Sequence, residues 1–569
     1  MLHHPALRRL PGYGFFLVAG LAATLLFYSY LKTGHYATPA WRLAQILSFW
    51  LGGIGMLWFY RWRYFLFTIL ALTSARGYAI LSGQPGHHSL FALQFGMAAG
   101  LAVLHLYQKR HTIRLASNST SGGAASVGTA PEFLPGMLWL FIGLLLALMM
   151  RNFYVYFGPT VLEGVWQDRE VANGVSANYA WHLGAHIALN LLGPALFVFA
   201  DRLWTGRHHQ DLFRQVIQAL SLAFWIQYLA ISLEYIGFER LTAGAGDHWR
   251  IAGRLPGLFT DSGASGVMLP VLWLVAAWRL VARPKRPIAN ALQTWLENRQ
   301  IKIAVLQGLA VVLMVLIWFQ LAHIQGRMFV LSTVNLCFAL FIGLFLLRRQ
   351  LYPDRKTLRQ VWRSRWNTRQ LAGGAGLALI GAGLLCWLLL ETPVTALLKT
   401  QATTLMSHIL VGNWSLAFQD LDPVRSAYYT AGWHLFRAAH WSGWGLGSFM
   451  VYSRPWLPAT IPLDNPGGLW IGLLSDLGLC GVLCAALFLL RGLQKLRLQW
   501  RLESVPGRMG TPVASQSGWQ ISDAWLYVVC IAGLIGPAFF GYHILYAEYC
   551  SLLVFLAALG RIEPDPDTI

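Results

Sequence analysis

The sequence predicts an all-α polytopic membrane protein with about 14 transmembrane helices and one long loop outside the membrane. Of its 569 residues, 56% are hydrophobic and only 12% are charged, whereas soluble globular proteins carry about 25% charged residues. The mean hydropathy is +0.50, and the apolar residues fall into runs of about 20, the length that a helix needs to cross a bilayer. These observations exclude an ordinary soluble enzyme, a disulfide scaffold and a disordered chain.

The predicted spans divide the chain into four regions. Residues 1–210 hold the N-terminal transmembrane helices, 211–391 the central ones, 392–465 the long outside loop and 466–569 the C-terminal helices. The first apolar run is too long for a cleaved signal peptide, so it is interpreted as a membrane helix. The runs lie near residues 12–31, 43–60, 64–82, 88–107, 133–152, 179–200, 213–237, 259–282, 302–321, 328–347, 371–391, 466–490, 523–541 and 543–560. The last two form either two helices or one re-entrant element, because Gly536, Pro537 and Gly541 lie near their junction.

The distribution of basic residues predicts the orientation. The net charge is +20, and with the N-terminus inside, most of the 43 Lys and Arg residues fall in the inside loops. The segments Arg279–Lys302 and Arg348–Arg369 are the richest. The basic balance therefore indicates topology and contact with membrane lipids. No nucleic-acid partner is needed, and both termini are expected in the cytoplasm.

Basic residues in membrane proteins are usually concentrated in the cytoplasmic loops. Six arginines nevertheless lie in the predicted outside loops. They are Arg240, Arg250 and Arg254 in the loop 238–258, and Arg425, Arg437 and Arg454 in or just after the aromatic-rich part of the loop 392–465. Arginine holds phosphate with two parallel hydrogen bonds and stays charged at any physiological pH. Phosphate binding is one interpretation; pairing with nearby aspartates or with lipid head groups is the other.

Two glycine-rich stretches carry a family resemblance. The first runs from Arg254 through Gly257 to Asp261 and Gly266, and leads from an outside loop into a span. The second begins at Arg425, continues through Gly443-Trp-Gly445-Leu-Gly447 and ends in the helix that contains Asp476-Leu-Gly478-Leu-Cys-Gly481. In this order they resemble the signature regions of the O-antigen ligase and O-antigen polymerase superfamily, membrane glycosyltransferases of the GT-C type. The resemblance covers roughly residues 210–490.

The resemblance implies a multi-pass enzyme of the bacterial inner membrane with a periplasmic site. Its partners would be an undecaprenyl diphosphate-linked glycan donor and a lipid or glycan acceptor, and it would need no cofactor and no metal. Arg254 and Arg425 match essential arginines of the family, which implies that they neutralise the departing diphosphate. Further substrate-binding candidates are Arg250, Arg437, His440, Gly445 and Asn465.

The sequence departs from the ligase pattern at the catalytic base. Where ligases have a His-Asn pair, this chain has glycines, and the nearest polar pair is Asp464-Asn465. Asp464 is the candidate base, since the related SEDS peptidoglycan polymerases use an aspartate in a corresponding loop; His434 and His440 are alternatives. The pair could also simply cap the next helix, with Pro466 in its first turn. Ligase and polymerase activity remain equally open.

A proton- or ion-coupled transporter is the rival interpretation. It rests on charged and histidine side chains inside predicted spans, which are costly in lipid and must face the protein interior. These residues are Arg76, His182, His186, Glu234, Asp476 and Glu548. The two histidines lie four residues apart on one helical face, but no third metal ligand accompanies them, so hydrogen bonding in the core is the better interpretation.

Overall fold

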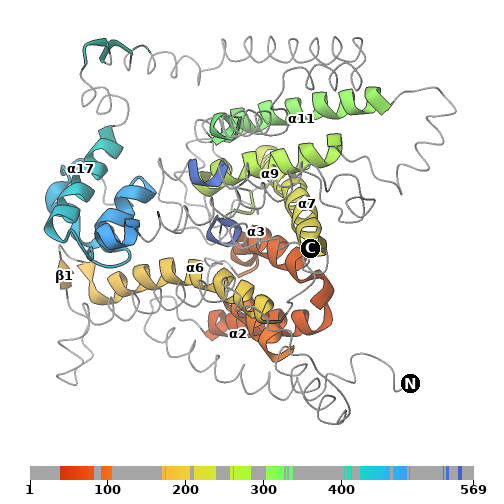
Figure 1. Cartoon of the computed structure of the whole chain (residues 1–569), viewed down its shortest axis with the longest axis horizontal. Helices are drawn as coiled ribbons and strands as arrows, with labels where there is room; N and C mark the ends of the chain where they lie inside the picture. Colours follow the sequence, from red (N-terminus) through yellow and green to blue (C-terminus); the bar gives the residue numbers. More distant parts are fainter. Residues whose placement is uncertain are drawn as a thin grey trace, which may run out of the picture.

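The computed structural model of the chain is predominantly helical (Figure 1). It describes the following residues: 39–82, 91–104, 170–172, 175–204, 210–238, 255, 257–259, 262–282, 303–325, 329, 332–337, 403, 406–408, 410–412, 423–461, 466–483, 486, 530, 533–536 and 549–553. Helices coincide with eight of the predicted apolar runs, which confirms the helical class for this part of the chain. The predictions for 12–31, 133–152 and 371–391 lie outside the described residues.

The first described helices pack through glycine. Helix α2 spans Pro39–Trp58, and a second apolar helix spans Phe91–Leu104. A Cβ atom on Gly96 would lie 1.9 Å from the carbonyl oxygen of Phe49, and one on Gly100 would lie 2.7 Å from that of Gly53. The two backbones therefore touch directly. Small residues four apart that allow such contact are typical of helix pairs in membranes.

The central helices form one continuous core. They are α3 (Arg63–Ser82), α6 (Ala177–Trp204), α7 (Gln210–Tyr235), α9 (Ser262–Ala282) and α11 (Ile303–Gln325). Helix α3 packs against α7, α7 against α9, and α9 against α11 (Figure 1). Phe67 of α3 stacks on Phe197 of α6 with ring centroids 4.1 Å apart. Side chains also hydrogen-bond between helices: Gln227 donates to the Leu72 carbonyl at 2.7 Å, and Tyr228 to Gln320 at 2.6 Å.

Three segments that were all predicted to face the cytoplasm meet at one end of this core. The short 3₁₀ helix η2 (Tyr60–Trp62) links α2 to α3. At the start of α3, Arg63 forms a buried ion pair with Asp201 near the end of α6, and the Tyr64 hydroxyl donates to the same carboxylate. Gln215 of α7 donates to the Arg61 carbonyl at 2.6 Å. The contacts bring together chain ends that the charge distribution assigned to one side.

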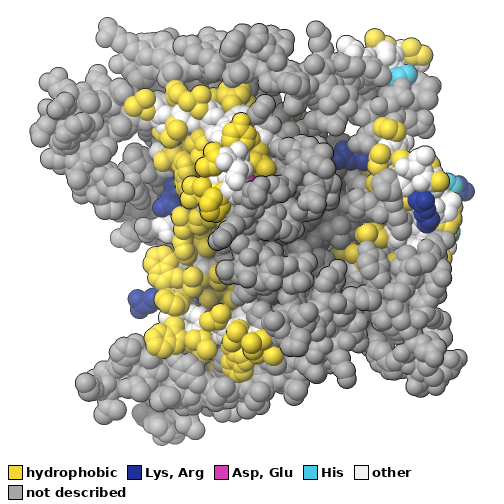
Figure 2. All heavy atoms as spheres, turned by 180° about the vertical axis from the view of Figure 1, so that it is seen from behind, with side chains coloured by type: hydrophobic (Ala, Val, Ile, Leu, Met, Phe, Trp, Pro, Cys, Tyr) yellow, Lys and Arg dark blue, Asp and Glu magenta, His cyan; other side chains and the backbone are white. Residues whose placement is uncertain are grey.

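A stripe of exposed apolar residues runs along α2. Its members recur every three or four residues and are between 44% and 64% exposed: Leu43, Leu47, Leu51, Ile54 and Trp58. Helix α11 exposes a similar apolar surface, and hydrophobic side chains cover much of the described surface in Figure 2. Monomeric soluble proteins rarely expose contiguous patches of this kind. Such a face suits contact with lipid.

One helical stretch in the described part of the chain, Gln215–Tyr235, is long and apolar enough by itself to cross a membrane. Its 21 residues span about 31 Å at 1.5 Å per residue, close to the thickness of a bilayer core. Six shorter apolar stretches lie in the other helices, including Ile187–Asp201 and Leu469–Leu483. The remaining crossings stay a prediction.

Two short strands depart from the all-α expectation. Strand β1 (Glu170–Ala172) pairs antiparallel with β2 (Val175–Ser176) just before α6. The two residues between the strands are Asn173 and Gly174, the dipeptide most favoured in two-residue hairpins. The hairpin contacts the start of α6 and the short helix α18 (Ser448–Tyr452).

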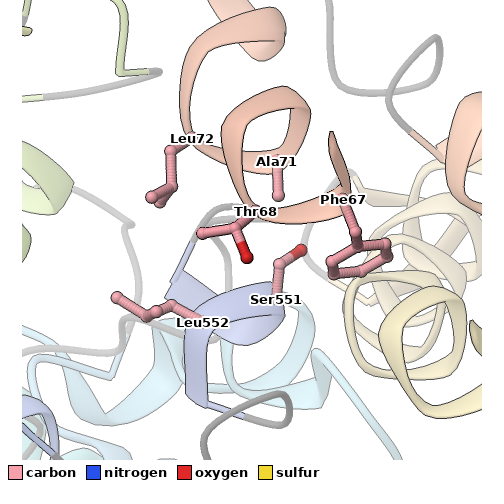
Figure 3. A pocket seen from close by; sticks show the side chains of 6 residues that line it. All are labelled: Phe67, Thr68, Ala71, Leu72, Ser551 and Leu552. Atoms are coloured by element: carbon pink, nitrogen blue, oxygen red, sulfur yellow. The ribbon is translucent and has the colours of Figure 1, made fainter. Parts of the chain in front are cut away.

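A small pocket lies inside the helical core, between α3 and the segment 549–553 (Figure 3). Phe67, Thr68, Ala71 and Leu72 line one side, and Ser551 and Leu552 line the other. It has room for about one water molecule.

Candidate functional site

The second signature stretch folds into a compact unit at the end of the molecule where α6 begins (Figure 1). It consists of α17 (Pro423–Ala438), a glycine-rich turn, α18, the 3₁₀ helix η4 (Arg454–Trp456) and the helix Leu469–Leu483. Tyr428, Ala431 and Leu435 recur at helical spacing along α17 and are buried, and they pack with Phe449 and Leu457. This apolar face fixes α17 against the rest of the unit.

Arg425 lies in the first turn of α17 and is half-buried. A Cβ on Gly467 would come within 3.5 Å of Cγ of Arg425 and within 3.2 Å of the Tyr428 ring. The stem of Arg425 therefore lies against the glycine turn that precedes the helix Leu469–Leu483. The candidate base Asp464 and its neighbour Asn465 precede Gly467 by three and two residues in the sequence, and both lie outside the described residues.

The Gly443–Gly447 turn requires its glycines. Gly443, Gly445 and Gly447 have φ angles of +61°, +107° and +76°, a region in which a side chain is strained. A Cβ on Gly443 would lie 2.4 Å from the carbonyl carbon and oxygen of Asp476, and one on Gly447 would lie 2.9 Å from the Leu183 side chain. The first and third glycines therefore let backbone approach the next helix and α6.

Asp476 holds this turn in place. Its buried carboxylate accepts hydrogen bonds from the Gly447 amide at 2.8 Å, the Ser448 hydroxyl at 2.8 Å and the Phe449 amide at 3.1 Å. The two amides belong to the N-cap residue and the second residue of α18, so Asp476 caps that helix from a distant part of the chain. Hydrogen bonds to a charged acceptor are about twice as strong as neutral ones.

The backbone of residues 440–445 also pairs with the helix that contains Asp476. Trp444 and Gly445 donate to the carbonyls of Ser475 and Asp476 at 3.0 and 2.7 Å. In return, Leu479 and Cys480 donate to the carbonyls of His440 and Trp441 at 2.8 and 3.1 Å. Gly478 makes this possible, since its φ of +63° interrupts the regular helix. The Gly445 amide, a predicted substrate contact, is engaged in this pairing.

Arg437 and His440 lie at the other end of α17 from Arg425, and both are exposed. Arg437 follows Arg425 by 12 residues on one helix, which separates their Cα atoms by about 18 Å. His440 Nδ1 lies 2.6 Å from the Arg437 carbonyl oxygen. A carbonyl only accepts, so Nδ1 is the donor in this contact. The predicted site residues therefore fall into two separate groups, one around Arg425 and one around Arg437.

The remaining polar residues of the unit have local roles. Arg454 donates to the carbonyls of Ile461 and Ala459 at 2.9 and 3.4 Å, which fixes the chain between η4 and Ile461. His434 stacks on Trp456 with ring planes 3° apart. The guanidinium of Arg454 is thus used to hold main-chain carbonyls, a role that the sequence did not predict.

The first signature stretch is anchored on α7. The Gly257 amide donates to Glu234 at 2.9 Å, and the Leu258 amide donates to Gln227 at 2.8 Å. Gly257 has a φ of +62°, and a Cβ there would lie 2.8 Å from the Gln227 side chain. Arg250 and Arg254 lie outside the described residues. The turn that follows Arg254 in sequence is nonetheless fixed to a buried glutamate and a buried glutamine.

No protein family, curated protein or solved structure matches this chain. The interpretation of the site therefore rests on its own residues. Both anchored turns pack on the same core: Leu255 and Phe259 from the first, and Leu446, Leu469 and Leu477 from the second, belong to one apolar cluster with α6, α7 and α9.

Sequence reasoning missed the anchors of both turns. Asp476 appeared as part of the second signature stretch and as an intramembrane charge, and Glu234 only as an intramembrane charge. Gln227 did not stand out among polar residues in an apolar run. A signal was available in the sequence: each glycine turn has amides that need acceptors. An isolated polar residue in a neighbouring apolar run could have been predicted to accept from them. Sequence reasoning also missed the buried pair of Arg63 and Asp201.

Proposed function

We propose that the chain is an inner-membrane glycosyltransferase that moves a glycan from undecaprenyl diphosphate to an acceptor hydroxyl on the periplasmic side. The observation that carries the proposal is the contact of Arg425 with the Gly467 turn, which follows directly after Asp464 and Asn465. Tertiary packing brings the side chain of Arg425, of a type that binds phosphate, against a turn that begins shortly after Asp464 in the sequence. These are the two groups that the transfer needs.

Several features support embedding in a membrane. Helix α2 exposes an apolar stripe, α2 and the helix Phe91–Leu104 touch through glycines, and Gln215–Tyr235 has the length and composition of a span. Trp58, Phe59 and Trp62 are exposed where α2 meets α3, as expected of aromatic residues at a membrane–water interface. The contacts of Arg61, Arg63 and Asp201 agree with the predicted cytoplasmic side.

In the proposed reaction, the acceptor oxygen attacks the anomeric carbon as the bond from that carbon to the diphosphate oxygen breaks. The electron pair of the broken bond leaves with the diphosphate, and the configuration at the carbon inverts. The Arg425 guanidinium stabilises the charge that develops on the leaving group. The proton of the acceptor hydroxyl passes to Asp464. His440 is less suited as the base for this site, since Arg425 and His440 lie at opposite ends of α17.

The transporter interpretation receives less support. It needs Glu234 and Asp476 as members of an ion or proton pathway. Both carboxylates instead accept hydrogen bonds from backbone amides of the two glycine turns. Arginine-bearing stretches held in fixed turns suit the recognition of a defined anionic substrate better than alternating access.

The first experiment is deletion of the gene in its host, with analysis of lipid-linked glycan and surface polysaccharide. We expect polyprenyl-linked glycan to accumulate while the surface product is lost. Long trapped chains indicate a missing ligase, and single repeat units a missing polymerase. No change in either pool contradicts the proposal and favours a transporter.

Complementation with Arg425→Lys tests the site itself. Lysine keeps the charge but loses the planar fork, so we expect a large loss of surface polysaccharide at a normal protein level. Arg61→Lys is the matched control, because Arg61 is an exposed arginine in η2, at the predicted cytoplasmic end. Wild-type product in the Arg425→Lys strain contradicts the assignment of Arg425 to the diphosphate.

A further inference from the structure

The end of α17 that carries Arg437 presents an exposed aromatic and basic surface. Trp433 is 49% exposed and Trp441 is 66% exposed, and Arg437 lies midway between them, four residues from each. Trp433 contacts Phe436 at 5.2 Å between ring centroids, and Phe436 contacts the His440 ring at 6.4 Å. We call Trp433, Arg437, His440 and Trp441 the α17 surface.

The charge of this surface has one sign. Between Pro423 and Leu463 the sequence contains arginines and histidines but no aspartate or glutamate. Figure 2 shows exposed basic and histidine side chains on the corresponding part of the molecule. An exposed arginine between two exposed tryptophans, in a stretch of sequence without acidic residues, suits a partner that is anionic at its surface and apolar just beneath.

Packing fixes the depth of the α17 surface relative to the predicted spans. A Cβ on Gly432 would lie 2.4 Å from the Ile471 side chain, so α17 lies against the first turn of the helix Leu469–Leu483. The turn after α17 reaches Leu183 and Gly184 of α6 through Gly447. These residues lie about 9 Å along α6 from its first residue, Ala177. The unit is therefore docked beside the outer ends of two predicted spans and does not extend away from them.

We propose that the α17 surface lies in the head-group region of the outer leaflet and binds anionic phospholipids there. Tryptophan favours this region because its ring is apolar and its N–H needs a polar partner. Arg437 pairs with the phosphate, while its alkyl stem and the indole rings lie against the upper acyl chains. The proposal rests on the membrane embedding argued above and is independent of the transferase chemistry.

Photo-crosslinking in nanodiscs tests the proposal. The full-length protein carries p-benzoylphenylalanine in place of Ala438, an exposed neighbour of Arg437, in discs of equal amounts of phosphatidylglycerol and phosphatidylcholine. Mass spectrometry of the adducts gives the ratio of the two lipids. We expect an excess of phosphatidylglycerol of about fivefold, the factor that corresponds to about 1 kcal/mol for one basic residue at an anionic surface. Arg437→Gln should bring the ratio close to one.

A second crosslinker position separates the possible failures. The same residue in place of Leu47, in the exposed stripe of α2, should capture both lipids equally. Adducts at position 47 but none at position 438 overturn the proposal for the α17 surface and leave membrane embedding intact. Absence of lipid adducts at both positions overturns the embedding as well. Equal capture of the two lipids at position 438, or capture of added glycan instead of lipid, also overturns the anionic lipid as the ligand.

Discussion

Replacing Gly443 with alanine should open the glycine-rich turn after α17. Gly443 has a φ of +61°, and an added Cβ would lie 2.4 Å from the carbonyl carbon and oxygen of Asp476. The backbone conformation costs about 1 kcal/mol for an L side chain. Overpacking against rigid backbone costs about 1 to 3 kcal/mol more. The turn should therefore lose about 2 to 4 kcal/mol of local stability.

Trypsin cleavage after Arg437 measures this opening. Arg437 lies in the last turn of α17, and the following residues are fixed by hydrogen bonds of the Gly443 turn. Cleavage needs local unfolding, and its rate follows the population of the open form when opening is fast. A loss of 2 to 4 kcal/mol corresponds to a rate increase of about thirtyfold to several hundredfold at 1.4 kcal/mol per factor of ten. The rate is read from the appearance of the fragment by mass spectrometry.

Gly412→Ala is the matched control. Gly412 has a φ of +76°, but an added Cβ would meet nothing within 4 Å. It carries the backbone cost alone and lies outside the turn, so cleavage after Arg437 should keep its wild-type rate. If Gly443→Ala also cleaves at the wild-type rate, the close contact between Gly443 and Asp476 does not exist and the reasoning is refuted.

Two further predictions concern the helical core. Gly96→Leu should force α2 away from the helix Phe91–Leu104 and lower the thermal aggregation midpoint of the purified protein in detergent. Gly55→Leu should leave the midpoint unchanged, because a Cβ there meets nothing within 4 Å. Equal midpoints for the two variants would disprove the close packing. Asp201→Asn should destabilise the protein by about 3 to 5 kcal/mol, because it leaves the buried charge of Arg63 without its counter-ion. Adding Arg63→Met should then raise the midpoint again, and a further drop would argue against the pair.

The two stretches that resemble a transferase family were singled out from the sequence, but their arrangement in space was not predicted. Both stretches form anchored glycine turns on one core. Arg425, Arg437 and His440 were all predicted to belong to the same site. A single continuous helix separates them, since its rise places residues 12 apart at about 18 Å.

The sequence by itself determined the helical class and the apolar character of the chain. Composition and the length of the apolar runs suffice for this, because every helix must satisfy its own backbone and present an apolar face whatever its neighbours are. The boundaries of α3, α7 and α9 fall within a few residues of the predicted runs.

Only the tertiary structure decided what the isolated polar residues do. Asp476 caps a helix that begins 28 residues earlier in the chain, Glu234 binds an amide 23 residues later, and Arg63 pairs with Asp201 across 138 residues. A buried charge must find a partner, but the sequence does not say which one, because that choice depends on how whole helices pack. The same packing brought Arg425 to the Gly467 turn, the contact on which the proposed chemistry depends.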